Sequence, residues 1–178
     1  MKAILFLLLT SFVFGESDFN FSKKFSGTFN GKKLEYTAKV YEKVIFERDD
    51  STKPLASFVV TEYSVSNQKN RPVMFSFNGG PGSASLWLHM GVLGPKVVKV
   101  PSDASDDGSP PYNLINNKLS PLDKADLVFI DPIGTGYSRP LGEHEGKEFW
   151  GVKQDAVVIA EFILSLIHIS EPTRLWHI

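Results

Sequence analysis

The pentapeptide Asn78–Gly82 (Asn-Gly-Gly-Pro-Gly) is the sequence feature that most constrains the fold. The residues before it, 72–77, are short, apolar and aromatic, which predicts a buried strand. Residues 83–90 predict the start of a helix with Ser83 as its N-cap. A strand, a glycine turn and a helix start together point several backbone N–H groups at one place, and glycine lets a ligand approach the main chain. The pattern predicts an oxyanion hole or another anion site, with an ordinary tight turn as the alternative.

Composition excludes several classes of function. The 178 residues suffice for one domain, and a formal net charge of −1 gives no indication of binding to nucleic acid or to an anionic membrane. Cysteine is absent, so a disulfide framework, a thiol nucleophile and a cysteine-based zinc site are excluded. No pair of histidines has metal-binding spacing. We therefore predict no metal and no cofactor.

The N-terminus has the form of a secretory signal peptide. Lys2 supplies the positive charge, residues 3–14 are apolar, and small residues lie near Gly15. The apolar run is too short to span a bilayer comfortably. We predict a signal peptide over residues 1–15 and a secreted or periplasmic protein that has no membrane contact after its removal. The alternative is an N-terminal core strand.

The rest of the chain predicts alternating strands and helices. Residues 34–46 and 55–65 favour a hairpin of two long strands, and residues 126–131 favour a second buried strand. Residues 149–163 carry the apolar stripe of a helix that faces a core. We predict an α/β fold in which an antiparallel hairpin joins a mostly parallel sheet. Ligands of such sheets bind beyond the carboxyl ends of the strands, where the glycine turn lies.

Three segments resemble the serine carboxypeptidase family, whose fold is the α/β-hydrolase. They are FNGGPGSASLWLHMGVLGP (77–95), PPYNLINNKLSPLDKADLVFIDPIGTGYS (110–138) and FWGVKQDAVVIAEFI (149–163). The resemblance covers roughly residues 33–163, with the motifs in the order of the family. One departure is Ser83, where eukaryotic members usually carry cysteine. The resemblance implies an incomplete α/β-hydrolase domain.

The resemblance also implies roles for three residues of the glycine turn. The Gly80 N–H would be one donor of the oxyanion hole. The Asn78 side chain and the Gly79 N–H would bind the free C-terminal carboxylate of a peptide substrate. An amide and backbone donors can bind a carboxylate without a permanent cation. For Asn78 the alternative is a turn-forming residue before glycine.

The nucleophile of such an enzyme is missing from the sequence. The G-x-S-x-G signature of a nucleophile elbow is absent, and the nearest match, around Ser138, ends in Pro140. The resemblance places the catalytic serine, aspartate and histidine after Ile163, so we expect this chain to be inactive. We interpret Ser138 as a structural or substrate-side residue.

Other polar and aromatic candidates are weaker. We expect His89 to be packed or hydrogen-bonded, His144 to be solvated in a polar loop, and Asp131 to belong to a structural turn. Trp87, Trp150 and Tyr137 could line a cleft or fill the core, and the sequence does not separate these alternatives.

The last fifteen residues differ from the rest. Residues 164–174 (LSLIHISEPTR) resemble the conceptual translation of a transposon-type sequencing-library adapter. We therefore expect a carboxypeptidase-like domain over residues 16–163 and a tail over 164–178 that is not biological. The alternative is a genuine extension of the preceding helix.

Two other functions remain open at this point. The chain could derive from an acyltransferase that resembles the peptidases, or it could be a secreted, non-catalytic module that binds an anion or a peptide. We also expect poor solubility, because the strand at 126–131 would have an exposed edge without later strands.

Overall fold

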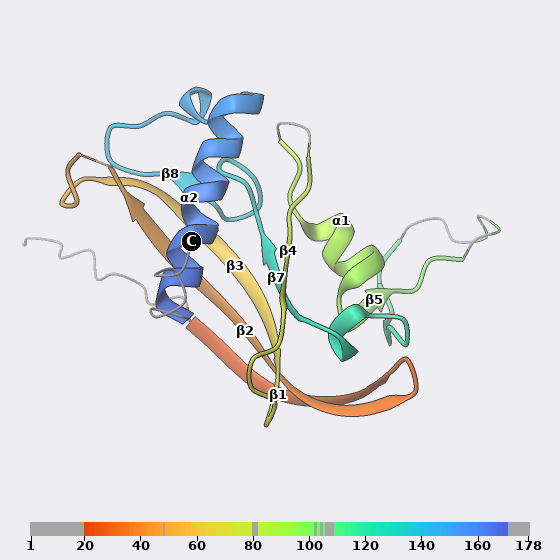
Figure 1. Cartoon of the computed structure of the whole chain (residues 1–178). Helices are drawn as coiled ribbons and strands as arrows, with labels where there is room; N and C mark the ends of the chain where they lie inside the picture. The colour runs from red at the N-terminus through yellow and green to blue at the C-terminus, as the bar shows by residue number, and fades with distance from the viewer. Residues whose placement is uncertain are drawn as a thin grey trace, which may run out of the picture.

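The computed structural model describes residues 20–47, 49–79, 82–101, 103, 105 and 109–170, without the side chains of residues 167–170. The predicted signal peptide, Gly80 and residues 171–178 lie outside the described residues. A six-stranded sheet forms the centre of the molecule, and three long strands follow one another along it. They are β1 (Asn20–Phe29), β2 (Lys32–Phe46) and β3 (Pro54–Val65), all paired antiparallel (Figure 1).

The hairpin of β2 and β3 confirms the prediction for residues 34–46 and 55–65, whereas β1 is an additional strand. Asn30 and Gly31 join β1 to β2 with φ angles of +48° and +80°. Positive φ at both central positions matches the twist of a two-residue hairpin and favours Asn-Gly. The Asn-Gly pair is therefore a signal from which β1 could have been predicted.

The prediction of a mostly parallel sheet is wrong. The strand order is β1-β2-β3-β7-β4, with β8 (Arg139–Pro140) beside β3. Among the described strands, only β4 (Val73–Ser76) and β7 (Asp126–Ile130) pair in parallel, because β7 returns antiparallel to β3. The sheet is mixed, which is consistent with an α/β-type protein that has few helices.

The positions of β4 and β7 also differ from prediction. The strand β7 lies between β3 and β4, and residues 127–130 are buried. The strand β4 is the edge of the sheet, where Val73 is 49% and Met74 37% exposed. The predicted exposed edge at 126–131 is therefore wrong, and so is the predicted burial of residues 72–77. Apolar composition alone does not distinguish a central strand from an edge strand.

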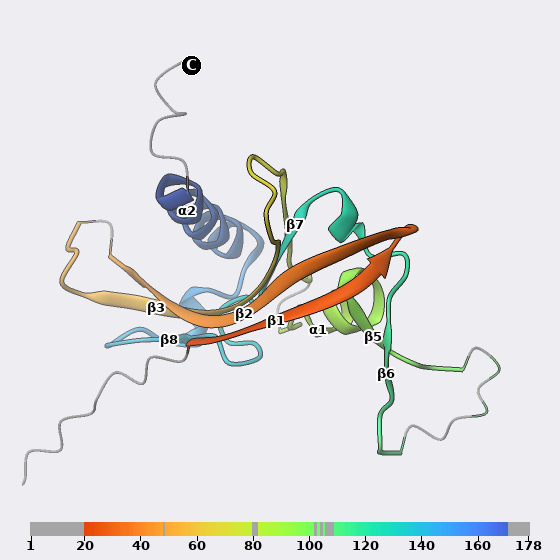
Figure 2. The same cartoon turned by 90° about the horizontal axis from the view of Figure 1, so that it is seen from below.

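Short helical segments connect the strands, and one long helix follows them (Figure 2). The helix predicted at residues 83–90 is a single α-turn, α1 (Leu86–Leu88), continued by a π-turn, η1 (His89–Leu93). The long helix is α2 (Val152–Ser170). The remaining elements are the 3₁₀ turns η2 (Pro121–Asp123) and η3 (Gly146–Glu148) and the small sheet of β5 (Lys96–Val98) and β6 (Leu114–Asn116).

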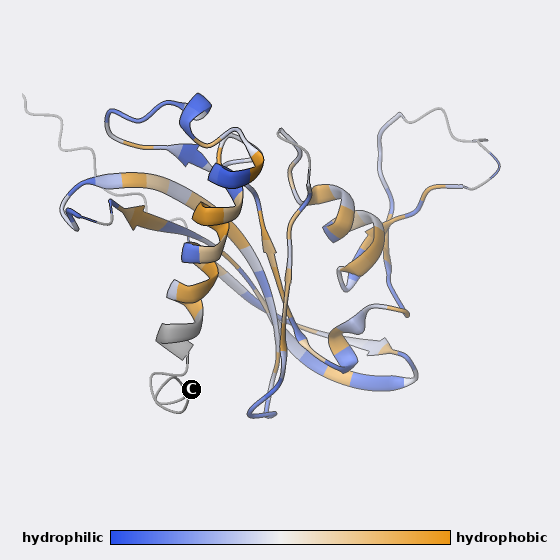
Figure 3. Cartoon of the chain, turned by 45° about the horizontal axis from the view of Figure 1, so that its top comes forward, coloured by the Kyte–Doolittle hydropathy of each residue, from blue (hydrophilic) through white to orange (hydrophobic). Residues whose placement is uncertain are grey.

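Two apolar clusters lie on opposite faces of the sheet, because successive side chains of β7 point to opposite sides. Val128 and Ile130 belong to the cluster under α2, in which the rings of Phe58 and Phe162 lie 4.4 Å apart. Leu127 and Phe129 belong to the other cluster, which Leu93 of η1 covers. Figure 3 accordingly colours much of α2 and of the α1–η1 segment as apolar.

The helix α2 continues beyond the predicted end at residue 163. Leu166 packs against the same cluster as Phe162, so the helix and its core contact cross the boundary expected between domain and tail. Among the described residues, no helix combines the length and apolar character that a membrane span requires.

Candidate functional site

The glycine turn lies where two parallel strands end. The strands β4 and β7 pair in parallel with Ser76 opposite Phe129, so the segments that follow both strands leave the sheet at the same edge. Beyond this edge is a cavity of about 430 Å³. Its walls include Gly79 and Gly82 from the glycine turn, Ile133 after β7, and Trp150, Asp155 and Ile159. The position agrees with the rule that ligands of such sheets bind beyond the strand ends.

The predicted binding residues lie beside this cavity. Asn78 is half-buried and Gly79 is exposed, and no described atom lies within 4 Å of the position that a Cβ at Gly79 would take. Gly80, the predicted oxyanion donor, lies outside the described residues. Gly82 has a φ of +95°, a conformation that favours glycine whatever the surrounding space.

The start of the helix differs from prediction. Ser85, not Ser83, is the N-cap residue of α1, and its hydroxyl does not cap the helix. The Ser85 N–H and the Ser85 hydroxyl both donate to Oδ1 of Asp131, each at 2.8 Å. A protein carboxylate therefore takes the backbone and hydroxyl donors of Ser85 at the observed start of α1.

Asp131 lies in the tight turn that follows β7. A Cβ added to Gly136 would come 2.0 Å from Oδ2 of Asp131, and Gly136 has a φ of +53°. Ser138 closes this turn and is 3% exposed. Its Oγ accepts a hydrogen bond from the Val59 N–H at 2.9 Å. The burial and this bond agree with the interpretation of Ser138 as structural.

His89 is packed and hydrogen-bonded, as the sequence led us to expect. Its Nε2 lies 2.6 Å from the hydroxyl of Tyr63, and its ring stacks on Phe129 with centroids 4.4 Å apart. Burial lowers the pKa of His89 to about 4, and the negative charge of Asp131 opposes this shift in part. The imidazole is therefore neutral at pH 7.

The opposite wall of the cavity comes from the start of α2 and the residues before it. Burial raises the pKa of Asp155, whose neighbours in the cavity are mostly apolar. The sequence could have indicated this position, because Asp155 lies four residues before Ile159, a buried residue of the predicted core-facing helix. Trp150 lines the cavity, whereas Trp87 and Tyr137 are 70% and 75% exposed and do not fill the core.

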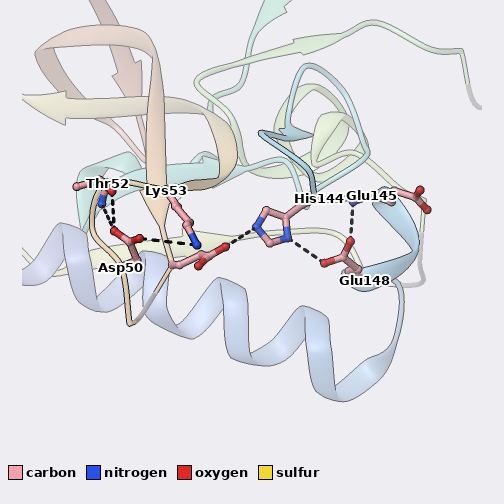
Figure 4. Close-up of polar contacts among 7 residues, drawn as sticks. Asp50, Thr52, Lys53, His144, Glu145 and Glu148 are labelled. Atoms are coloured by element: carbon pink, nitrogen blue, oxygen red, sulfur yellow. Dashed lines mark hydrogen bonds and ion pairs between the residues drawn. The ribbon is translucent and has the colours of Figure 1, made fainter.

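His144 is not simply solvated. Its Nδ1 lies 2.9 Å from Oε2 of Glu148, and its Nε2 lies 3.1 Å from Oε1 of Glu47 (Figure 4). Hydrogen bonds to Glu148 and, less strongly, to Glu47 raise the pKa of His144. The described residues include no group of three or more histidines and carboxylates that could hold a metal ion.

Comparison with known proteins identifies the family. Residues 50–165 match the family model described as serine carboxypeptidase, which is more than half of the chain. The protein belongs to the serine carboxypeptidase family.

Curated relatives support this assignment. They include the pheromone-processing carboxypeptidase KEX1 from three strains of Saccharomyces cerevisiae, JAY291, ATCC 204508 / S288c and Lalvin EC1118. Each is 33% identical over 102 residues, which is 57% of this chain. The matched region is only 12% to 13% of the length of each relative.

Proposed function

We propose that this chain is the N-terminal part of an exported serine-type carboxypeptidase that releases C-terminal residues from peptides through an acyl-enzyme. One observation carries the proposal: within the family match, the glycine turn borders a cavity at the shared carboxyl ends of β4 and β7. The turn is therefore placed where a substrate could reach its backbone donors.

Three residues of the turn have a role in this proposal. Asn78 and the Gly79 N–H bind the terminal carboxylate of the peptide, and the Gly80 N–H donates to the oxyanion. The open space beside Gly79 supports this role, since a ligand can approach the main chain there. Loss of one oxyanion donor typically costs about 3–4 kcal/mol of transition-state stabilisation.

We further propose that residues 16–163 are an incomplete α/β-hydrolase domain, preceded by a signal peptide at 1–15 and followed by a non-native tail at 164–178. The exposed apolar side chains of the edge strand β4 support this, because a further strand could pair there. In this proposal the catalytic serine, aspartate and histidine belong to later sequence, and the 178-residue chain does not cleave peptides.

Binding of the peptide carboxylate tests the site directly. A blocked dipeptide with a free C-terminal carboxylate and the same dipeptide as its C-terminal amide are titrated into the ¹⁵N-labelled chain. We expect the acid to bind more tightly and to shift the Gly79 amide signal, and we expect Asn78→Ala to remove this preference. Asn67→Gly is the matched control, because Asn67 lies in a remote turn at a φ of +61° that glycine tolerates. Equal binding of acid and amide would contradict the proposed site.

Sequencing of the native transcript from the codon of Phe149 tests the boundaries. A reading frame that continues past Ile163 into a nucleophile elbow supports the proposed enzyme and tail. A native transcript that encodes residues 164–178 and then stops would contradict both. The non-catalytic anion-binding module is less well supported, since Asp131 already occupies the donor of Ser85.

A further inference from the structure

A chain of polar side chains lies behind the glycine turn and joins three parts of the fold. Tyr63 of β3 contacts His89 of η1, and Asp131 after β7 accepts both donors of Ser85. His89 is also close enough to Asp131 for the carboxylate charge to act on the imidazole. The central member, Asp131, has no role in the carboxylate and oxyanion contacts proposed above.

Two contacts hold the segment that contains the glycine turn, one at each end, and Asp131 makes the second. We call this pair of contacts, Ser76–Phe129 and Ser85–Asp131, the clamp. At one end of the segment, Ser76 of β4 pairs with Phe129 of β7. At the other end, Ser85 is bonded to Asp131, only two residues further along the chain from Phe129. The two ends of the segment, at Ser76 and Ser85, are therefore held by residues only two positions apart in the chain, Phe129 and Asp131. Fixing both ends of a loop removes conformations that would otherwise misplace its backbone donors.

The position of the Asp131 carboxylate is itself tightly determined. Oδ1 accepts two hydrogen bonds from Ser85, while Oδ2 lies in the space that a side chain at residue 136 would need. Any Cβ at Gly136 would displace the carboxylate, and the φ of +53° there also disfavours other residues. The turn after β7 is thus shaped around this carboxylate.

We propose that Asp131 is a positioning residue for the glycine turn: its carboxylate holds Ser85 against the end of β7 and so fixes the Asn78 side chain and the Gly79 N–H beside the cavity. The expected effect of Asp131 on peptide binding rests on the proposed function, whereas the clamp itself does not depend on a ligand. Asp131 also accepts the Ser85 N–H, so this donor is not offered to a peptide carboxylate.

Amide hydrogen exchange on the ¹⁵N-labelled full chain tests the clamp. In Asp131→Asn the neutral amide oxygen accepts more weakly than the carboxylate, so we expect exchange at Ser85 to accelerate about tenfold relative to the Val128 amide in β7. We also expect the Gly79 amide to become more mobile in ¹⁵N relaxation. Ser85→Ala keeps the backbone bond and loses the hydroxyl bond, so its effect is smaller and in the same direction. Asp126→Asn is the matched control, since Asp126 begins β7 and bonds Arg71 and the Val65 N–H instead.

Peptide binding by the same variants separates this inference from the proposed function. Asp131→Asn should reduce the preference for acid over amide about tenfold, while Asp126→Asn keeps it. If the unaltered chain shows no such preference but Asp131→Asn still loosens Gly79 and Ser85, the proposed function fails and the clamp stands. Unchanged exchange at residue 85 in both Asp131→Asn and Ser85→Ala overturns the clamp. Acceleration that is equal at Val128 overturns it as well, and if Asp131→Asn does not fold, Ser85→Ala decides by the same criterion.

Discussion

Two histidines of this protein respond to their surroundings in opposite directions. His89 lies behind the glycine turn, stacked on Phe129, and burial lowers its pKa to about 4. His144 lies in the loop before η3, between Glu148 and Glu47, and these carboxylates raise its pKa. The first imidazole is therefore kept neutral, and the second is stabilised as a cation.

The difference shows that the contacts that each ring makes in the fold, and not the residues next to it in the sequence, decide the direction of its pKa shift. His144 is flanked by Glu143 and Glu145 in the sequence, yet its ring contacts Glu148 and Glu47, the latter 97 residues away. His89 has a carboxylate nearby in Asp131, but loss of hydration outweighs that charge. A buried neutral histidine costs stability in acid, and an ion-paired histidine loses its contribution in base.

Removal of the Phe129 ring, which stacks on His89, should have the largest effect on the contrast between the two histidines. Phe129 is 1% exposed in the core, and Phe129→Ala should lower the free energy of unfolding by about 3–5 kcal/mol. Water admitted to the site should also raise the pKa of His89 toward the ordinary value. Urea denaturation measures the stability, and an NMR titration of the His89 ring measures the pKa. Phe77→Ala, at a ring that is 42% exposed, should cost clearly less; an equal cost would contradict this account.

Acid should destabilise the protein through His89 before most carboxylates titrate. The folded-state pKa of His89 is lowered from 6.5 to about 4, so its contribution is complete above pH 6.5 and is lost as the pH falls toward 4. The unfolded chain takes up the proton first, and the loss should reach about 2 kcal/mol by pH 5. Urea denaturation between pH 7.5 and pH 5 tests this. His89→Gln cannot titrate, so its stability should change less over this range; a profile as steep as that of the unaltered chain would exclude His89 as the cause.

Loss of the hydroxyl that contacts His89 should have a smaller effect. Tyr63→Phe keeps the ring packing but leaves the Nε2 of His89 without its 2.6 Å partner, which should cost about 1–2 kcal/mol. Urea denaturation at pH 7.5 measures this cost. Tyr41→Phe is a useful comparison, because Tyr41 lies on β2 away from His89. If Tyr63→Phe left stability unchanged while the His89 pKa stayed near 4, the hydroxyl would contribute nothing.

Local sequence patterns predicted four of the strands but not their arrangement, and they missed β1, β5, β6 and β8. The hairpin of β2 and β3, the short strand β4 and the strand β7 all follow from apolar and β-branched runs bounded by turn residues. Their order does not follow, because the same apolar run suits a central or an edge position. The insertion of β7 between β3 and β4 made the sheet mixed and moved the exposed edge from β7 to β4.

The location of the candidate site was predicted to a similar extent, whereas the roles of Asn78, Gly79 and Gly80 stay predictions. The glycine turn and its position beyond the strand ends followed from a contiguous motif, and both Gly79 and Gly82 border the cavity. The bond between Ser85 and Asp131 joins residues 46 positions apart, and no local pattern indicates such a pairing. The start of the helix was misplaced for the same reason, since its N-terminal donor is satisfied by a distant carboxylate rather than by Ser83.

His144 should give the smallest change in stability and the opposite pH dependence. Its pKa is raised above 6.5, so its contribution is complete below pH 6.5 and is lost as the pH rises through the folded-state value. The neutral ring has only one N–H and can donate to one of its two carboxylates. An NMR titration of both histidine rings should therefore place the His144 midpoint above 6.5 and the His89 midpoint near 4.

Glutamine variants of Glu148 and Glu47, together with added salt, test the difference between the two histidines further. Glu148→Gln should lower the His144 midpoint more than Glu47→Gln, because the hydrogen bond to Glu148 is the larger cause of the shift. Added salt should also lower the His144 midpoint, since Glu148 is 45% exposed and its charge is screened by solvent ions. The same salt should leave His89 almost unchanged, because burial rather than a charged partner sets its pKa. If neither glutamate substitution changed the pH midpoint of the His144 titration, the ring would not bridge η3 and the β2–β3 hairpin in solution.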